Sequence, residues 1–199
     1  DNSRPAVDDS YHGAGRPAGT SPGSMDRYVV IGNPVAHSRS PEIHARFALE
    51  MGEAMAYDRL LVAPGGFERA AGEFFSAGGR GANVTLPFKV DAFSFATVRT
   101  ARAEAAGAVN TLARQDGAII GDNTDGAGLV RDLVANLGFA LAGARILLLG
   151  AGGAARGVLG PLLAQLPASV VIANRTAGRA VDLAARFRGQ VPVSGVALD

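Results

Sequence analysis

The sequence predicts an α/β fold made of two successive units, each a mostly parallel sheet with helices packed on it. Short apolar, β-branched segments alternate along the chain with segments of helical character, which is the order of a sheet with crossover helices. An apolar strand at 145–149 also runs directly into a glycine-rich turn and then a helix-forming segment at 158–166. With 199 residues, 48% of them hydrophobic, the chain is long enough for two small cores.

The composition excludes several classes of protein and site. A net charge of +1 gives no electrostatic footprint for nucleic acid or an anionic membrane, and no uninterrupted apolar stretch is long enough to span a bilayer. The absence of cysteine excludes disulfides and thiolate nucleophiles and suits a reducing compartment, so we expect a cytoplasmic protein. Three histidines do not favour a histidine-rich site, and we expect no bound metal.

The first unit is predicted over residues 25–125. Residues 1–24 precede it, are rich in Gly, Pro, Ser and Asp, and lack hydrophobic periodicity, so we expect a disordered leader or an added remnant there. The first helix of the unit is expected to start at Pro41 with Ser40 as its cap. The inner face of that helix is expected to carry Ile43, Phe47 and Ala48.

The remainder of the first unit alternates strands with helices. The segment Gln115-Asp116-Gly117 contains the Asp-Gly pair that is typical of a tight hairpin, so one strand of this sheet should run antiparallel. The predicted strands are 28–31, 57–62, 81–85, 108–113 and 118–121, and the further predicted helices are 67–76 and 99–106.

A connecting helix at 126–137 is predicted between the two units, within a linker that we assign to 126–142. The second unit is predicted over 143–199. A second strand is expected there at 169–173, and a third strand is expected to begin within 191–196. The residues of the connecting helix that have core spacing are Leu129, Leu133, Val134 and Leu137.

The glycine-rich turn carries the fingerprint Gly-x-Gly-x-x-Ala. Gly150 lets the strand turn sharply, and Gly152 has no side chain that would hold a pyrophosphate away from the backbone. The N–H groups and the positive dipole end of the following helix then face an anion. Ala155 still permits close packing of helix and strand, so the context favours a nucleotide-binding Rossmann unit over a purely structural turn. The expected cofactor-binding loop is Gly150, Ala151, Gly152, Gly153 and Ala154.

The end of the next strand indicates which nucleotide binds. An NAD site has an acid there for the ribose hydroxyls, whereas this chain has Asn174-Arg175-Thr176, with Arg179 one turn later. A guanidinium attracts a 2′-phosphate and can bind it through two hydrogen bonds, which favours NADP over NAD. The alternative interpretation is that Arg175 and Arg179 form the solvated start of a helix.

Four polar segments follow predicted strands of the first unit, where open α/β sheets bind their ligands. The hydroxyls of Ser38 and Ser40 can point to the same side, Lys89 follows a proline that ends a strand, and Asp125 lies between a strand and a helix. Taken singly, each segment is explained as well by a turn, a cap or a solvated charge. The segments are 38–40, 83–89, 109–111 and 121–126.

Together with the glycine-rich turn, these segments resemble the shikimate dehydrogenase family. Their order and spacing match over roughly residues 26–199, and six motifs in register are not explained by chance. The motifs are Asn-Pro-x-x-His-Ser-x-Ser-Pro at 33–41, Asn-Val-Thr-x-Pro-Phe-Lys at 83–89, Gly-Ala-Val-Asn-Thr at 107–111, Gly-Asp-Asn-Thr-Asp-Gly at 121–126, Gly-Ala-Gly-Gly-Ala-Ala-Arg at 150–156 and Asn-Arg-Thr at 174–176.

The resemblance implies the NADPH-dependent reduction of 3-dehydroshikimate to shikimate in aromatic amino-acid biosynthesis. It implies that Lys89 and Asp125 are the catalytic pair, which agrees with elementary chemistry: an ammonium beside a ketone oxygen stabilises the charge that hydride addition builds there. The substrate-binding residues that it implies are Ser38, Ser40, Thr85, Lys89, Asn110 and Asp125. The 2′-phosphate pocket that it implies is formed by Asn174, Arg175, Thr176 and Arg179.

The family continues beyond the last residue of this sequence, with an Asn-Ala-Thr-Pro-type segment and a final helix that supplies a glutamine to the substrate. We therefore expect an incomplete, truncated cofactor-binding unit. The alternatives that stay open are a quinate or quinate/shikimate dehydrogenase, a non-catalytic module that senses shikimate and, more distantly, a folate-type dehydrogenase. The expected partner is a small-molecule substrate; the sequence does not decide the oligomeric state, and a homodimer stays one option.

Overall fold

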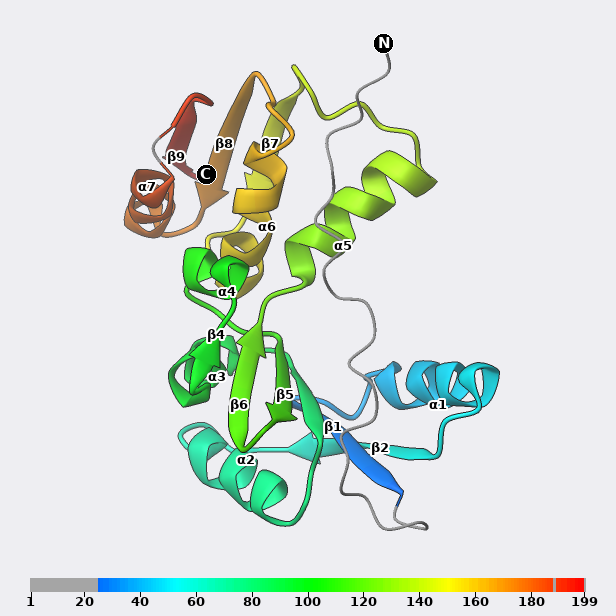
Figure 1. The fold of residues 1–199 in the computed structure, drawn as a ribbon. Helices are drawn as coiled ribbons and strands as arrows, with labels where there is room; N and C mark the ends of the chain where they lie inside the picture. Colours follow the sequence, from blue (N-terminus) through cyan, green and yellow to red (C-terminus); the bar gives the residue numbers. More distant parts are fainter. Residues whose placement is uncertain (1–24, 188, 199) are drawn as a thin grey trace.

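A computed structural model describes residues 25–187 and 189–198, so the expected leader lies outside the described residues. The described chain forms two sheets, one above the other in Figure 1, which are joined by helix α5 (Asp125–Arg131). Five of the seven strand pairings in these sheets are parallel, which confirms the predicted α/β class with mostly parallel sheets.

The first sheet has six strands in the order β2-β1-β3-β5-β6-β4. Strand β5 runs antiparallel to both β3 and β6, which confirms the expected antiparallel strand. The hairpin turns at Asp116 and Gly117, whose φ angles of 49° and 83° are the left-handed values that an Asp-Gly turn favours. The strands are β1 (Asp26–Gly32), β2 (Met55–Leu61), β3 (Gly81–Val84), β4 (Val98–Arg99), β5 (Thr111–Gln115) and β6 (Ala118–Asp122).

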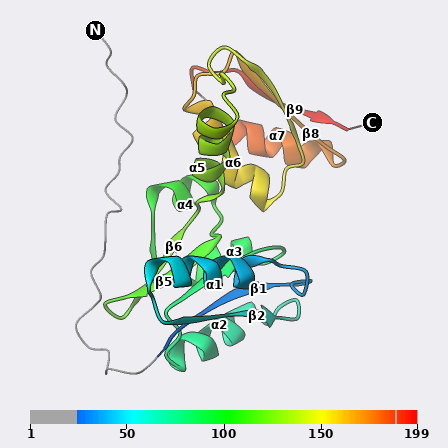
Figure 2. The ribbon, with the colours of Figure 1, turned by 90° about the vertical axis from the view of Figure 1, so that its right-hand side faces the viewer.

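Helices α2 and α3 share an aromatic core with the first sheet. The rings of Phe67 and Phe88 lie 5.5 Å apart between centroids, and both side chains are buried. Helix α1 lies on the opposite face of the sheet (Figure 2). None of the helices in the described part of the chain is long and apolar enough to cross a membrane. The helices of this unit are α1 (Ser40–Met51), α2 (Phe67–Ser76), α3 (Lys89–Phe95) and α4 (Ala101–Ala106).

The start of α1 differs from the prediction. Ser40 is already the first helical residue, the cap position is Arg39, and no side chain caps the helix. The expected capping by Ser40 is therefore wrong. The hydroxyl of Ser40 instead accepts a hydrogen bond from the Ser38 hydroxyl at 3.1 Å, so it stays outside the helix and in contact with the preceding loop.

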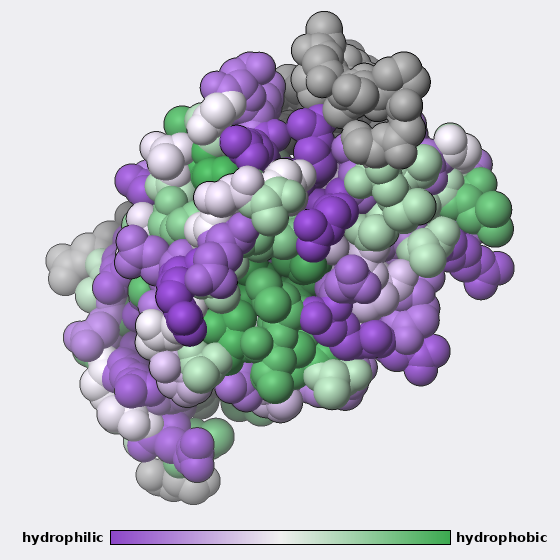
Figure 3. All heavy atoms as spheres, turned by 90° about the horizontal axis from the view of Figure 1, so that it is seen from below, coloured by the Kyte–Doolittle hydropathy of each residue, from purple (hydrophilic) through white to green (hydrophobic). Residues whose placement is uncertain are grey.

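The apolar side of α1 is largely open among the described residues. Ala48 is buried as expected, but Ile43 and Phe47 are 47% and 54% exposed, so the predicted inner face is wrong at these two positions. Helical spacing shows which side of a helix is apolar, but not whether another element covers it. Seen from below, the molecule gathers apolar side chains at the centre of its surface, with polar ones around them (Figure 3).

The second sheet has three parallel strands in the order β7-β8-β9, and β9 confirms the expected third strand. Leu159 of α6 packs on Val170 and Ile172 of β8 to form its core, and all three are fully buried. Strand β7 pairs only with β8 among the described strands, and Leu147 and Leu149 on it are strongly exposed. The elements are β7 (Arg145–Leu149), α6 (Gly153–Leu163), β8 (Ser169–Asn174), α7 (Ala177–Arg186) and β9 (Val193–Ala197).

The connecting helix is built differently from its predicted pattern. Helix α5 continues into a π-helical turn, η1 (Asp132–Asn136), and the expected core residues Leu129, Val134 and Leu137 are 37%, 43% and 59% exposed. Their predicted burial is wrong because α5 packs on its glycine side. A Cβ built at Gly126 would lie 2.5 Å from the carbonyl oxygen of Gly157 in α6, so only glycine permits this backbone contact.

Candidate active site

A cavity of about 360 Å³ opens at the edge of the first sheet, where β1 and β3 end and where α1, α3 and α5 begin. Its size suits a small ring compound. Because β1 and β3 are parallel neighbours, the loops that follow them meet at the same edge. The fold brings all six predicted substrate-binding residues into the lining of this cavity, namely Ser38, Ser40, Thr85, Lys89, Asn110 and Asp125.

A lysine–carboxylate pair forms part of the cavity wall. Nζ of Lys89 lies 2.6 Å from Oδ2 of Asp125, and the two side chains are only 17% and 24% exposed. Each residue is the first of a helix, Lys89 of α3 and Asp125 of α5, so two helix starts meet here. Partial burial reduces the screening of the pair by solvent, so its charges act strongly on whatever occupies the cavity.

Asn110 holds the second oxygen of the Asp125 carboxylate. Nδ2 of Asn110 donates to Oδ1 of Asp125 at 2.7 Å. The amide oxygen of Asn110 accepts hydrogen bonds from the backbone N–H of Thr124 at 3.0 Å and from the Thr111 hydroxyl at 2.9 Å, which fix the orientation of the amide. The carboxylate is therefore held between an ammonium and an amide, in one orientation toward the cavity.

Two hydroxyls form another part of the wall. Besides the contact between the Ser38 and Ser40 hydroxyls, the backbone N–H of Ser40 donates to Oγ of Ser38 at 3.3 Å. Nε of Arg59, in β2, donates to the carbonyl oxygen of Ser38 at 2.9 Å and so holds this loop against the sheet. Sequence reasoning missed Arg59, which lies 21 residues away and carries no local signal.

The glycine-rich turn lies directly beside this cavity. The φ angle of Gly150 is 101°, a left-handed value that side chains rarely adopt, and its N–H donates to the carbonyl oxygen of Ala173 at 2.7 Å. Helix α6 then begins at Gly153, where a built Cβ would be 3.5 Å from the Cβ of Lys89. The N-terminus of α6 and the lysine–carboxylate pair are thus neighbours.

The predicted 2′-phosphate residues lie at the end of β8 and the start of α7, away from the cavity. Nδ2 of Asn174 donates to the carbonyl oxygen of Thr176 at 2.9 Å and shapes the turn. Arg175 and Arg179 are exposed and make no ion pair with another described residue, so the structure leaves both guanidinium groups open to an anion.

Comparison with known proteins shows which family this chain is similar to. A family model for the shikimate dehydrogenase substrate binding domain matches residues 30–112, and one for shikimate / quinate 5-dehydrogenase matches residues 132–198. The chain is 56% identical over 170 residues to the shikimate dehydrogenase (NADP(+)) of Dechloromonas aromatica (strain RCB), across 85% of this chain and 62% of that protein. The chain belongs to the shikimate dehydrogenase family.

Other relatives agree in sequence and structure. The shikimate dehydrogenase (NADP(+)) of Cupriavidus necator is 56% identical over 179 residues, across 90% of this chain and 61% of that protein. An Ael1 enzyme from Pseudomonas putida superposes with a TM-score of 0.79 and 42% identity, across 87% of this chain and 64% of that chain. Shikimate 5-dehydrogenase from Thermus thermophilus, solved with NADP(H) and shikimate, gives 0.76 and 36%, across 85% and 62%. The chain spans about three fifths of the length of these curated shikimate dehydrogenases.

A second group of residues, which the sequence prediction did not assign to the substrate, also lines this cavity. Asn83 and His44 belong to the lining. The Tyr57 hydroxyl donates to Oδ1 of Asn83 at 2.6 Å, and the ring of His44 stacks on that of Tyr57 with 4.2 Å between centroids. Asn83 shares a strand face with Thr85, which was the available signal, whereas nothing near Tyr57 in the sequence indicates its role.

The tyrosine keeps its proton as a donor in this group. Burial raises the pKa of Tyr57 to about 12, although a hydrogen bond with the Ser40 side chain acts in the opposite direction. At neutral pH the Tyr57 hydroxyl is therefore protonated and donates to Asn83. This bond orients the Asn83 amide, whose nitrogen reaches the Thr111 hydroxyl at 3.4 Å.

Proposed function

We propose that this chain catalyses the NADPH-dependent reduction of 3-dehydroshikimate to shikimate. The observation that supports it most directly is the Lys89–Asp125 pair, which lies in the wall of a small polar cavity and next to the start of a nucleotide-type helix. The relatives named as shikimate dehydrogenase (NADP(+)) support the same reaction.

The residues of the second unit fit a dinucleotide. A Cβ built at Gly150 or Gly152 would meet no described atom within 4 Å, so the space above the turn is open for a pyrophosphate. The N–H groups at the start of α6, a helix of 11 residues, would bind it. NADPH, when bound, supplies the hydride.

Lys89 would act on the oxygen of the substrate ketone. As hydride adds to the carbonyl carbon, the C=O π electrons move to the oxygen, and the Lys89 ammonium stabilises that charge and transfers its proton to it. In the reverse direction, neutral Lys89 would take the proton of the hydroxyl. Asp125, held by Asn110, would orient the ammonium and accept a hydrogen bond from a neighbouring hydroxyl.

The other cavity residues would hold the substrate. The adjacent hydroxyls of Ser38 and Ser40 would donate to its carboxylate, and Thr85 and Asn110 would contact the ring hydroxyls. No side chain in this set has to ionise for binding. This division of roles predicts that the serines act on binding and that Lys89 acts on the chemical step.

Arg175 and Arg179 support NADP as the cofactor of this chain. Both guanidinium groups are exposed beside the end of β8, where an NAD site carries an acid instead. They would bind the 2′-phosphate through charge-assisted hydrogen bonds. With this cofactor the reaction would run toward shikimate in a cytoplasmic biosynthetic pathway, as the sequence motifs imply.

The absorbance of NADPH tests the proposal. Initial rates would be measured with shikimate and with quinate, each with NADP⁺ and with NAD⁺. We expect the highest kcat/KM for shikimate with NADP⁺. Preference for quinate with NAD⁺ would instead make the chain a quinate dehydrogenase and would overturn the proposed substrate.

Isothermal titration separates an enzyme from a sensing module. We expect the chain to bind shikimate and to bind NADP⁺. Binding of shikimate with neither NADP⁺ binding nor turnover would overturn the proposed oxidoreductase function and would favour a module that only senses shikimate.

A further inference from the structure

Asn123 lies between the catalytic loop and the helix that would carry the cofactor. We propose that Asn123 is a positioning residue for Asp125 and that it transmits the position of helix α6 to the Lys89–Asp125 pair. The catalytic meaning of this inference rests on the proposed function. The contact through which α6 would shift Asp125 is independent of that function.

The side chain of Asn123 is buried, and both its amide nitrogen and its amide oxygen are hydrogen-bonded. It is 2% exposed and is the only buried polar side chain among the residues that the structure describes. Its Nδ2 donates to the carbonyl oxygen of Ala108 at 3.0 Å, and its Oδ1 accepts from the backbone N–H of Asp125 at 3.2 Å. The second bond spans two residues and so fixes the backbone on which the Asp125 carboxylate is mounted.

The same amide lies against helix α6. A Cβ built at Gly157 would be 2.6 Å from Oδ1 and 2.9 Å from Nδ2 of Asn123, so only glycine lets the amide take this place. The Gly157 carbonyl has no helical donor at position 161, because Pro161 lacks an N–H, and this carbonyl faces Gly126 of α5. Helix α6 therefore touches the loop both through Asn123 and through Gly126.

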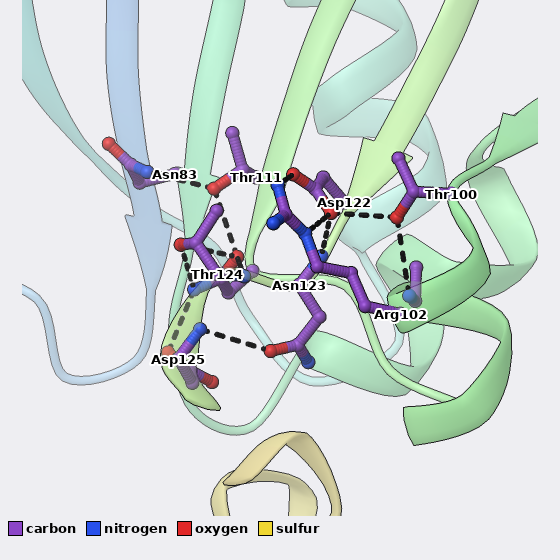
Figure 4. Close-up of polar contacts among 10 residues, drawn as sticks. Asn83, Thr100, Arg102, Thr111, Asp122, Asn123, Thr124 and Asp125 are labelled. Atoms are coloured by element: carbon purple, nitrogen blue, oxygen red, sulfur yellow. Dashed lines mark hydrogen bonds and ion pairs between the residues drawn. The ribbon is translucent and has the colours of Figure 1, made fainter. Parts of the chain in front are cut away.

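The other end of the loop is tied to the first sheet. The Asp122 carboxylate accepts from the backbone N–H of Asn123 at 2.7 Å, from the Thr100 hydroxyl at 2.7 Å and from Nε of Arg102 at 2.6 Å. Figure 4 shows this cluster on one side of the loop and the Asn123 amide pointing from it toward the neighbouring turn of helix. With Asp122 fixed, a shift of α6 is taken up between Asn123 and Asp125.

The contacts of α6 near its N-terminus show how anion binding there would affect the Lys89–Asp125 pair. The helix begins at Gly153, beside the side chain of Lys89, and it contacts Asn123 one turn further on at Gly157. A movement of α6 upon binding an anion at its N-terminus would thus reach both members of the ion pair, Lys89 directly and Asp125 through Asn123.

One added methyl group on α6 tests the link. In Gly157→Ala the new methyl displaces the Asn123 amide, whereas in the control Gly160→Ala the methyl meets only Cε1 of Phe187 at an ordinary 3.6 Å. Lys89 is the only lysine in the sequence, so reductive methylation with ¹³C-formaldehyde gives one side-chain signal, identified by its loss in Lys89→Arg. We expect Gly157→Ala to shift this signal and Gly160→Ala to leave it in place.

Substitution of Asn123 itself tests the hydrogen bond. A serine hydroxyl can accept from an N–H two residues later, so Asn123→Ser keeps the bond to Asp125 and Asn123→Ala loses it. We expect a shifted Lys89 signal in Asn123→Ala and a nearly native signal in Asn123→Ser. The control is Asn136→Ala, because Asn136 is exposed and its side chain donates to Asp132 one turn earlier.

The outcomes decide the inference even if no turnover is found, because the signal is read without substrate. An unchanged signal in both Asn123→Ala and Gly157→Ala overturns it. A shift in Asn123→Ala alone overturns the link to α6. Where shikimate turnover is present, we expect kcat of Asn123→Ala to fall about 10- to 100-fold through misplacement of Asp125. Its KM for shikimate should stay within about threefold, since the substrate contacts remain.

Discussion

Gly153 and Lys89 lie against each other although they begin helices of different units, α6 and α3: a Cβ built at position 153 would be 3.5 Å from the Cβ of Lys89. The start of the nucleotide-type helix and the ion pair therefore form one site. Substitutions of the ion pair should lower kcat and leave cofactor choice unchanged. Substitutions at the end of β8 should change cofactor choice and leave the chemical step unchanged.

Lys89→Ala removes the side chain that we propose to donate the proton and to stabilise the charge on the substrate oxygen. We expect kcat to fall about 10²- to 10⁴-fold, the usual contribution of general acid–base assistance. The measurement is the initial rate of NADPH formation from shikimate, with Arg69→Ala as a control, because Arg69 is an exposed cation on α2. A near-normal kcat with only a raised KM would show that Lys89 binds substrate without acting on it.

Asp125→Asn keeps the shape of the side chain but removes the charge that pairs with Lys89. We expect a loss of kcat comparable with that of Lys89→Ala, because the Lys89 ammonium loses the carboxylate oxygen that holds it at 2.6 Å. The initial rate of NADPH formation from shikimate would be compared with that of the wild type. A kcat equal to that of the wild type would contradict the proposed role of the carboxylate.

Arg175→Ala and Arg179→Ala remove the guanidinium groups from the end of β8. A hydrogen bond to a charged group contributes about 1.5–3 kcal/mol, so we expect the KM for NADP⁺ to rise about 10- to 100-fold in the double variant. The KM for NAD⁺ should change little, since NAD⁺ has no 2′-phosphate. Arg46→Ala, on the exposed side of α1, is the matched control. An equal effect on both cofactors would point to a structural role.

Asp122 makes the stability of the fold depend on pH. Burial alone would raise the pKa of Asp122, but hydrogen bonds from Arg102 and Thr100 outweigh it and hold the pKa below its ordinary value. Its carboxylate thus stabilises the fold above the ordinary value of about 4, and this contribution is lost as the pH falls through the lowered folded pKa.

Urea unfolding at two pH values tests this dependence. We expect the wild type to lose more free energy of unfolding between pH 7 and pH 3 than Asp122→Asn does (roughly the span over which such a carboxylate protonates). The control is Asp116→Asn, at the exposed hairpin turn, where asparagine tolerates the left-handed backbone. Equal losses in wild type and Asp122→Asn would refute the assignment.

Local chemistry could be predicted from the sequence where the structure depends on neighbouring residues. The Asp-Gly turn at 116–117 fixes its own hairpin, and Gly150 permits the left-handed backbone at the turn after β7. Residues that follow the ends of parallel strands also meet predictably, which brought Ser38, Lys89 and Asp125 to one cavity. The catalytic and binding roles of these residues stay predictions.

What depends on distant packing could not be predicted. The spacing of Phe47 and Leu129 predicted buried faces, but burial needs an opposing element, which spacing does not supply. Asn123 is read from the sequence as one polar loop residue among several, and only its contact with Gly157, far along the chain, shows that it is buried. Tyr57 of β2 and Asn83 of β3 likewise meet although strand β1 lies between their strands in the sheet.

Strand β7 offers a free row of backbone N–H and C=O groups beside two solvent-facing leucines, Leu147 and Leu149, in the described part of the chain. An unpaired edge strand of this kind can form backbone hydrogen bonds with another extended chain. The polypeptide should therefore aggregate through this edge as its concentration rises. Leu149→Lys should reduce that aggregation, because a charged side chain on an edge strand opposes pairing with another chain.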